Sequence, residues 1–440
     1  MTRFIVGIAG VIFLALSCLL YVQVYRHVSP IKSHTDIDSP AYLERAELFC
    51  TTNTFARPGE QTVPYFTLGY PLIMGLIFKL FGLNKIIIIW FQVLLALITG
   101  LLLVIISRRL FNNTVAGITA LFFAGNLGFL VFSQFILTEI CLVFFLVLFF
   151  ERFSYFLQVY KFSALMTAGV SLGLSVIIKP AALYFPILLL PLISNKKMAT
   201  TWLFLFSFIL PIMSYSLHNN YIFGSYKLGS LDQVNLYFWF FPHVLAQENG
   251  TNSDIERAYL ARLNNHDPSF APVKKLFWQK FKHNPVRFIF VWLKNVFKTA
   301  AGLYTTNLKV LVDQNVHGGD ISFFRINGTI VQKIQRYITA GTSLTWVKTI
   351  GYLEAFWSVM RYILCLIGLF GLFYTRRYII LYFFSSYLFY FAMITGHDGC
   401  ARFRMLFEFV LLILAAYGLL LVTERIKHVL DMKKKERGYA

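Results

Sequence analysis

The chain has 440 residues, of which 58% are hydrophobic, 18% aromatic and only 14% charged. So few charged groups cannot cover the surface of a water-soluble globular protein of this length, and the composition therefore predicts an all-α polytopic membrane protein. The formal net charge of +20 does not predict nucleic-acid binding, because the basic residues are spread over many loops instead of one patch.

The N-terminal apolar stretch, 4–24, is long enough to cross a hydrocarbon core of ~30 Å. No small-residue cleavage site follows it, so we expect a retained signal anchor. A polar segment at 33–71 comes next and contains Asp36, Asp38 and Tyr42, with a short helix predicted over 41–49. Acidic residues at a membrane rim indicate a catalytic site rather than a linker.

Nine further apolar stretches are predicted to span the membrane: 86–106, 114–132, 140–157, 162–178, 181–193, 201–217, 351–373, 379–395 and 405–422. The stretch 66–82 is also apolar, but it contains Pro71 and Lys79. If it is interfacial or re-entrant and the N-terminus is cytoplasmic, the short basic loops all lie on the cytoplasmic side, as the positive-inside rule requires. These loops contain Arg108, Arg109, Lys161, Lys196, Lys197, Arg376, Arg377, Lys433, Lys434 and Lys435. This distribution of the basic loops favours about ten spans, in a range of about nine to twelve, with both termini cytoplasmic.

One long segment, 218–348, is predicted to lie outside the membrane, because it is too long for a simple connection. Its first part, 219–242, favours strand and loop, and a short helix is predicted over 254–263. The stretch 273–304 alternates basic and apolar residues at helical spacing, which predicts one or two helices in the outer interface. The segment is either a solvated cap or part of a substrate site, and the pattern favours neither.

We therefore divide the chain into three parts. An N-terminal transmembrane module, 1–217, carries the first extracytoplasmic loop, 26–85. The large extracytoplasmic region, 218–348, precedes the C-terminal transmembrane helices and basic cytoplasmic tail, 349–440. Cys50 and Cys400 are both predicted outside, where they either pair in an oxidising compartment or remain free thiols. The sequence has no metal-ligand spacing, so it implies no divalent metal and no certain cofactor.

Several motifs in order along the chain resemble the GT-C superfamily. They are Asp38-Ser39 with Tyr42, then LGYPLIMGLIFKLFG, SRRLFNNTVAGITALFFA, Thr138-Glu139, GLSVIIKPAALYFP and ARFRMLFEFVLLILAAYGL. GT-C proteins are membrane glycosyltransferases that use polyprenyl-phosphate-linked sugars, and they include protein mannosyltransferases and aminoarabinose transferases. Relatives often have Arg where this chain has Lys179, which keeps the charge but loses the planar fork of donors. Relatives also often have prolines near positions 406 and 409, where this chain has none.

The resemblance implies roles for the acidic residues of the outer face. Asp38 occupies the family's Asp position and is predicted to be the base that takes the proton of the acceptor hydroxyl. The alternative is a helix N-cap. Asp36 is then a supporting carboxylate or a surface group. Glu139 is predicted to orient the acceptor or raise the basicity of Asp38, with a carboxylate at a helix start as the alternative.

The leaving phosphate of the donor requires fixed cations. Arg402 and Arg404 are the leading candidates, with anchoring to lipid head groups as their alternative role. Lys179 is a further candidate, because a cation between two apolar stretches is costly without a partner. His397 and Arg57 are weaker candidates for the same phosphate. Contacts with sugar or acceptor, or anchoring in the interface, are predicted for Tyr42 and Tyr70.

The sequence thus predicts a hexosyl- or pentosyltransferase of the bacterial inner membrane with an extracytoplasmic active site. It would move one sugar from a polyprenyl phosphate to a lipid, glycan or protein acceptor, in a single displacement with inversion. Membrane lipids are the other expected partners, and the oligomeric state is left open. The alternatives are a transporter or flippase of lipid-linked sugar, a ligase or polymerase using a diphosphate-linked glycan, and an inactive scaffold.

Overall fold

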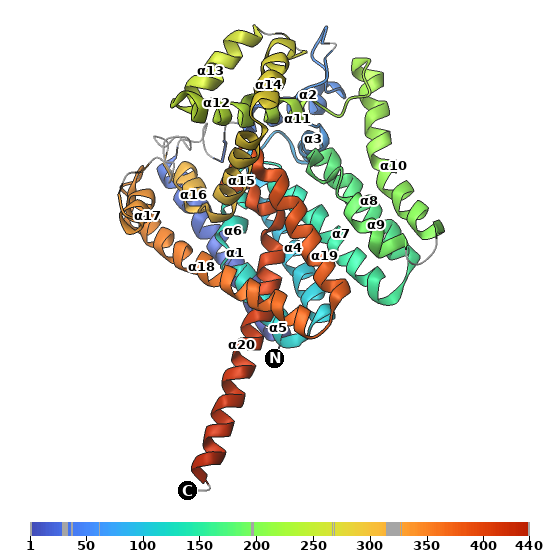
Figure 1. Cartoon of the computed structure of the whole chain (residues 1–440). Helices are drawn as coiled ribbons and strands as arrows, with labels where there is room; N and C mark the ends of the chain where they lie inside the picture. Colours follow the sequence, from blue (N-terminus) through green and yellow to red (C-terminus); the bar gives the residue numbers. More distant parts are fainter. Residues whose placement is uncertain are drawn as a thin grey trace.

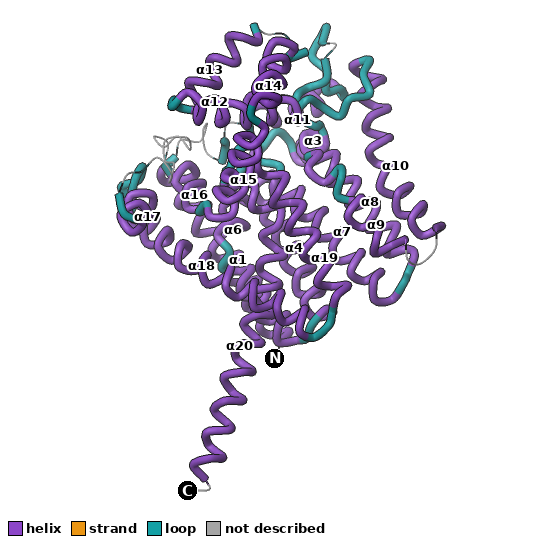
Figure 2. The backbone as a smooth tube through the Cα atoms, viewed as in Figure 1, coloured by secondary structure: helices purple, strands orange, loops and turns teal. Residues whose placement is uncertain are grey.

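The structure is a computed structural model that describes residues 2–28, 34–36, 38–60, 62–194, 198–265, 267, 269–313, 326 and 328–438. All regular elements within these ranges are helices, as Figure 2 shows. The predicted all-α class is confirmed. The predicted basic loop residues Lys196 and Lys197 lie outside the described residues.

Within the described ranges, seven helices are long and apolar enough to cross a membrane. They are α1 (Thr2–His27), α4 (Lys85–Leu110), α7 (Glu139–Val159), α10 (Met198–Phe223), α18 (Thr345–Tyr374), α19 (Tyr378–Ile394) and α20 (Met405–Gly438). An eighth span results if α5 (Asn113–Ala124) and α6 (Leu127–Gln134), bent by 47°, cross together. The apolar helices α3 (Gly69–Phe81), α8 (Phe162–Ile178) and α9 (Pro186–Ser194) are shorter. The chain is a multi-pass membrane protein, and the number of ten spans stays a prediction.

The stretch 66–82 forms a helix that is too short to cross a bilayer by itself. α3 has 13 residues, against about 20 for a span. It packs along α2 (Ser39–Thr52), where a Cβ added to Gly75 would lie 2.7 Å from the ring of Phe49. Helices α2 and α3 lie at the end of the bundle away from both chain termini, as Figure 1 shows.

The spans form one bundle around α20, and short helices cover the end opposite the termini (Figure 1). Nearly every residue of α20 from 405 to 417 is buried. Small residues let α18 approach it closely, because a Cβ on Gly368 would lie 2.4 Å from the Leu414 carbonyl oxygen. A Cβ on Gly418 would likewise lie 2.0 Å from the carbonyl oxygen of Leu364. The two backbones are therefore in direct contact, as is common between membrane helices.

The short helices over this end form a cap with an apolar core of its own. It contains α11 (Leu231–Val234), a π-helix (Asn235–Phe240), α12 (Phe241–Asn249), α13 (Ser253–Asn264), α14 (Ala271–His283) and α15 (Pro285–Ala301). Two further helices, α16 (Thr305–Val312) and α17 (Ile330–Thr339), lead back to the bundle. The helices predicted at 254–263 and 273–304 are confirmed.

Of the strand and loop predicted over 219–242, the loop is present at 224–230, but the prediction of a strand is wrong. α10 continues to Phe223, and 231–249 is helical throughout. The buried residues of this part recur at helical spacing. Tyr237, Phe240, Phe241 and Val244 all lie in the core of the cap. Burial against neighbouring helices therefore overrides the strand propensity of these residues.

Candidate active site

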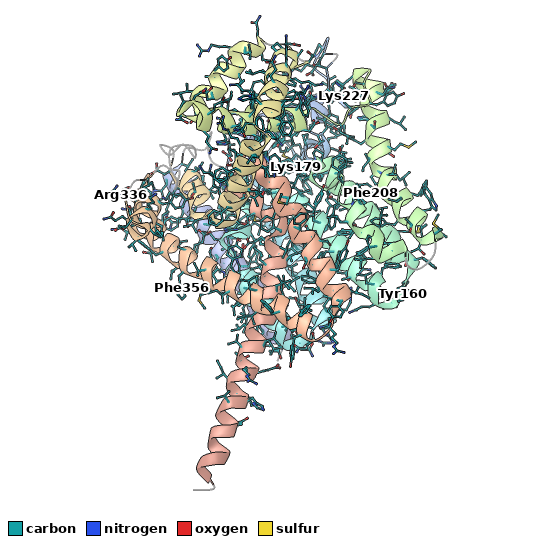
Figure 3. The ribbon with its side chains drawn as sticks, in the orientation of Figure 1. Tyr160, Lys179, Phe208, Lys227, Arg336 and Phe356 are labelled. Atoms are coloured by element: carbon teal, nitrogen blue, oxygen red, sulfur yellow. The ribbon has the colours of Figure 1, made fainter. Side chains whose placement is uncertain are left out.

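Four predicted site residues meet where the spans reach the cap. Asp38 directly precedes α2, and Glu139 is the first residue of α7. Lys179 follows α8, and Arg402 lies in the 3-10 turn Ala401–Arg404 that leads into α20. Figure 3 labels Lys179 near the middle of the molecule, where the bundle meets the upper helices. Segments far apart in sequence thus contribute to one site.

Arg402 is the centre of this group. Its Nη1 donates a hydrogen bond of 2.8 Å to Asp38 Oδ2, and its Nε donates one of 2.6 Å to Glu139 Oε1. Asp36 Oδ2 lies 3.8 Å from the same Nη1. The guanidinium is buried, whereas the side chain of Asp38 is 30% exposed. Arg402 therefore lies beside three carboxylates, of which Asp38 is the most exposed.

Lys179 adds a second cation. Its Nζ lies 3.5 Å from Glu139 Oε1 and 4.6 Å from the centre of the Phe403 ring. Pro180 positions the side chain, because a residue before proline avoids the helical region, and Lys179 is extended with φ −157° and ψ 126°. Asp36, Asp38 and Glu139 carry three negative charges against two positive ones, so these five side chains have a formal charge of −1.

Asp38 occupies the position before α2 without capping the helix through its side chain. The nearby turn is held by Ser39 instead, whose Oγ accepts a hydrogen bond of 2.8 Å from the backbone N–H of Asp36. The carboxylate of Asp38 is consequently directed to Arg402. The side chain of Asp38 therefore pairs with Arg402 and does not cap α2.

Tyr42 and Tyr70 lie edge to face, with ring centres 5.6 Å apart. Burial and the neighbouring Asp38 raise the pKa of Tyr42 well above its usual value, so this phenol stays protonated. Tyr70 is fully buried and donates a hydrogen bond of 2.9 Å to Gln92 Oε1. Gly69 allows this position, because a Cβ there would lie 2.3 Å from the carbonyl oxygen of Ile177. Tyr42 lines the cavity described below, whereas Tyr70 packs against Tyr42 and does not line the cavity.

The remaining predicted residues are placed differently. Arg404 lies in a separate buried network, where its Nε donates to Glu408 Oε2 at 3.0 Å and its guanidinium lies 4.1 Å from the Tyr304 ring centre. Arg57 is 56% exposed and pairs with Glu44 on the surface. His397 lines the cavity, with its Nδ1 3.1 Å from the Ile394 carbonyl oxygen. The structure thus brings His397 to the site but neither Arg404 nor Arg57.

A cavity of about 1390 Å³ opens on this group. Asp36, Asp38, Lys179 and Arg402 line one part of it. Its walls also contain residues other than the predicted site residues: Trp239, His243, Arg257, Lys294, Lys298 and Asp398. A sequence signal was present for the two lysines, because they are four positions apart and so lie on one face of α15.

The thiols and possible metal ligands of the described residues form no further centre. Cys50 and Cys400 are both free. Burial raises the pKa of Cys400 to about 12, so its thiol is not a nucleophile near neutral pH. No group of three or more His, Cys, Asp or Glu side chains in this part of the chain is arranged to hold a metal ion.

Comparison with known proteins adds to this geometry. A family model described as dolichyl-phosphate-mannose-protein mannosyltransferase matches residues 65–217. A sequence search of curated proteins finds no match. Among solved structures, the oligosaccharyltransferase of Archaeoglobus fulgidus is similar over 99% of this chain and 52% of its own, with 14% identity and a TM-score of 0.54. The chain has the GT-C fold. It spans about half the length of the archaeal enzyme.

Two further solved structures are also similar to this chain. The Archaeoglobus fulgidus protein in complex with an inhibitory peptide and a dolichol-phosphate has 15% identity and a TM-score of 0.50, over 99% of this chain and 52% of its own. ArnT from Cupriavidus metallidurans, bound to undecaprenyl phosphate, has 11% identity and a TM-score of 0.41, over 93% of this chain and 77% of its own. The predicted resemblance to the GT-C superfamily is confirmed.

The family model covers only part of the candidate site. Its matched range includes Glu139 and Lys179, whereas Asp38 and Arg402 lie outside it. The fold likeness extends over both of these positions. Roles for the individual side chains therefore rest on the geometry around Arg402.

Proposed function

We propose that the protein is a glycosyltransferase that moves one sugar from a polyprenyl phosphate to a hydroxyl or similar acceptor. The observation that carries this proposal is the accessible Asp38 carboxylate beside two cations, Arg402 and Lys179, in a cavity at the cap end of the spans. We place this end outside the bacterial inner membrane and both termini in the cytoplasm, because the short basic loops then satisfy the positive-inside rule.

The transfer needs a base at the acceptor and cations at the leaving group. Asp38 takes the proton of the acceptor hydroxyl, while the oxygen of that hydroxyl attacks the anomeric carbon of the donor sugar. The bond between that carbon and the phosphate oxygen breaks, and its electron pair leaves with the phosphate. One base and one departing phosphate give a single displacement with inversion.

Arg402 has a donor left for that phosphate. Its Nε and Nη1 bind Glu139 and Asp38, and Nη2 donates to no residue within the described ranges. Lys179, Lys294 and Lys298 line the same cavity. Fixed cations in a buried site stabilise a developing phosphate charge more than cations in water do. Glu139 is a positioning residue, because it orients Arg402 and Lys179 without lining the cavity.

The donor class follows from position and from the comparisons together. The cavity borders α18, a helix long and apolar enough to cross a membrane, where Val359 lines it and is 61% exposed. A lipid carrier beside α18 could therefore remain in the bilayer while its phosphate reaches the site. The matching family is named for a dolichyl-phosphate sugar, and the archaeal structure contains a dolichol-phosphate. Both support a polyprenyl-phosphate donor, whose sugar is a hexose or a pentose.

The test uses the Asp38→Asn variant of the full chain in lipid nanodiscs made from native membranes. Without the base, we expect the variant to retain donor, and native mass spectrometry should find a lipid monophosphate carrying one sugar. The control is Asp232→Asn, which changes an exposed aspartate of α11. A lipid diphosphate carrying a longer glycan would instead favour a ligase or polymerase. Unchanged movement of lipid-linked sugar across the membrane, with no transfer by the wild-type protein, would favour a flippase.

A further inference from the structure

One part of the cavity lies against the cap, and the transfer chemistry does not use it. Its wall is formed by the helical segment 231–249 and by the beginning of α13. Figure 1 shows α12 and α13 at the end of the molecule farthest from both termini. If the donor lipid approaches beside α18, as proposed above, this part of the cavity is left for a different ligand.

The segment 231–249 has two unlike faces. Asn235, Trp239, His243 and Gln247 recur every four residues and line the cavity. The residues between them on the opposite face, such as Phe241, are buried in the core of the cap. The middle part of the segment is a π-helix, Asn235–Phe240. π-Helical turns are rare and frequently occur at functional sites.

The cavity face of this segment carries polar groups that the fold leaves unused. The side-chain amides of Asn235 and Gln247 and the indole N–H of Trp239 make no hydrogen bond with any residue the structure describes. Each amide has two donors and an acceptor, and the indole has one donor. The wall therefore offers both donors and acceptors to a ligand.

Arg257 is held firmly beside Trp239. Its Nε donates a hydrogen bond of 2.9 Å to the Phe238 carbonyl oxygen, and its Nη1 donates one of 2.8 Å to Asp254 Oδ1. Its guanidinium lies 4.3 Å from the centre of the Trp239 ring, a cation–π distance. The indole and the guanidinium thus form a fixed platform in the wall, so binding there requires little ordering of side chains.

We propose that Trp239, Arg257, Asn235 and Gln247 form a subsite for a carbohydrate acceptor. This inference rests on the proposed function and names the class of its acceptor. Sugar hydroxyls both donate and accept hydrogen bonds, as the two amides do. The apolar C–H face of a sugar ring fits against an indole. A lipid acceptor would require an apolar wall, whereas this wall also contains Thr251, Ser253 and Asp254.

The size of the cavity agrees with two ligands. Sites for one small ligand occupy roughly 300–1,000 Å³, and this cavity measures about 1390 Å³. The sugar phosphate of the donor occupies the part near Arg402, and the terminal sugar of the acceptor lies against Trp239. The acceptor hydroxyl then points to Asp38, which lines the same cavity.

The test measures binding of soluble glycans to the full chain in nanodiscs. Neutral tetrasaccharides of mannose, glucose and N-acetylglucosamine are the probes, and saturation-transfer difference NMR detects their binding. We expect the wild-type protein to bind at least one probe, and Trp239→Ala to weaken that binding about tenfold or more, since stacking on the indole is lost. Gln247→Ala should weaken it by a smaller factor. The matched controls Trp278→Ala and Gln279→Ala change exposed residues of α14 and should bind like the wild type.

Three results would overturn the subsite. They are no binding of any probe, unchanged binding by Trp239→Ala, and preferential binding of a serine- and threonine-rich peptide that competes with the glycans. Asp38→Asn separates this inference from the proposed function, because it should bind glycans normally while losing transfer. Retained transfer by Asp38→Asn, with glycan binding that still depends on Trp239, would reject the base and leave the subsite standing.

Discussion

Arg402 Nη1 lies 2.8 Å from Asp38 Oδ2, although the two residues are 364 positions apart in the chain. The same guanidinium binds Glu139 at the start of α7. One side chain near the beginning of the last span therefore orders a loop that follows the first span. Because of this arrangement, substitutions at Arg402 and Asp38 should affect the same step.

Arg402→Lys should reduce transfer about a hundredfold or more, because an ammonium cannot reproduce the planar fork that meets Asp38, Glu139 and the phosphate. The rate of sugar transfer in membranes, corrected for the amount of folded protein, measures the effect. Arg425→Lys, at an exposed position of α20, is the matched control. A variant that keeps more than about a third of the wild-type rate would contradict the role of the fork.

Asp38→Asn and Asp36→Asn should differ strongly. Loss of a general base costs about 10²- to 10⁴-fold in rate, and we assign the base to Asp38. Asp36 lies 3.8 Å from Arg402 Nη1, so its loss should lower the rate by less than about tenfold. Single-turnover transfer with preloaded donor compares the two variants. Equal losses in both would show that the carboxylates act as one unit, with no single base.

Glu354→Gln should destabilise the fold rather than change the chemistry. Its carboxylate accepts hydrogen bonds of 2.6 and 2.8 Å from the backbone N–H groups of Tyr304 and Thr305, and it lies 3.4 Å from Arg404 Nη2. Removing one charge from a buried network costs about 3–5 kcal/mol. Thermal unfolding in detergent should show a lower Tm, whereas the exposed control Glu424→Gln should leave it unchanged. An unchanged Tm in both variants would argue against this network as a structural support.

The outer loop should lose stability in acid through Glu60. The hydrogen bond from Arg45 lowers the pKa of the Glu60 carboxyl below its ordinary value of 4.5, against the opposing effect of burial. A lowered folded-state pKa stabilises the fold above the ordinary value, and this contribution disappears as the pH falls through the folded-state pKa. Hydrogen exchange of peptides from 44–60, corrected for intrinsic rate, should therefore show less protection at pH ~3 than at pH ~7.

Glu60→Gln provides the internal check on that prediction. It removes the charged partner of Arg45, so the loop should already exchange faster at neutral pH and should change less on acidification. The control Glu47→Gln changes an exposed residue of α2 and should behave like the wild type. If Glu60→Gln keeps the full acid response, other carboxylates control the loop.

The sequence predicted which residues carry charge at the outer face. It predicted less well which residues these charged side chains contact. Arg402 and Arg404 were equivalent candidates because both belong to one short motif. In the structure they lie in a 3-10 turn, where residues two apart point in different directions, so one reaches the cavity and the other a buried network. In an extended chain, residues two apart point to the same side, so the spacing of Arg402 and Arg404 could not show that they face different surroundings.

In the cap, some helices could be predicted from the sequence and one could not. Its later helices follow from start signals and from periodic apolar residues, as at α13 and α15. The part that contains Trp239 was assigned to strand and loop, because its aromatic residues favour strands locally. Only packing against α14 and α15 makes it helical. The polar face that results was therefore not visible in the sequence.

The direct contact between the backbones of α18 and α20 determines which parts of the protein can move. Gly368 and Gly418 leave no gap into which either helix could shift. Arg402 is attached to one of these helices, and Val359, in the cavity wall, belongs to the other. Arg402 and the part of the cavity wall formed by α18 should thus behave as a single rigid frame. Substrate and product would then have to exchange without any movement of these two helices relative to one another.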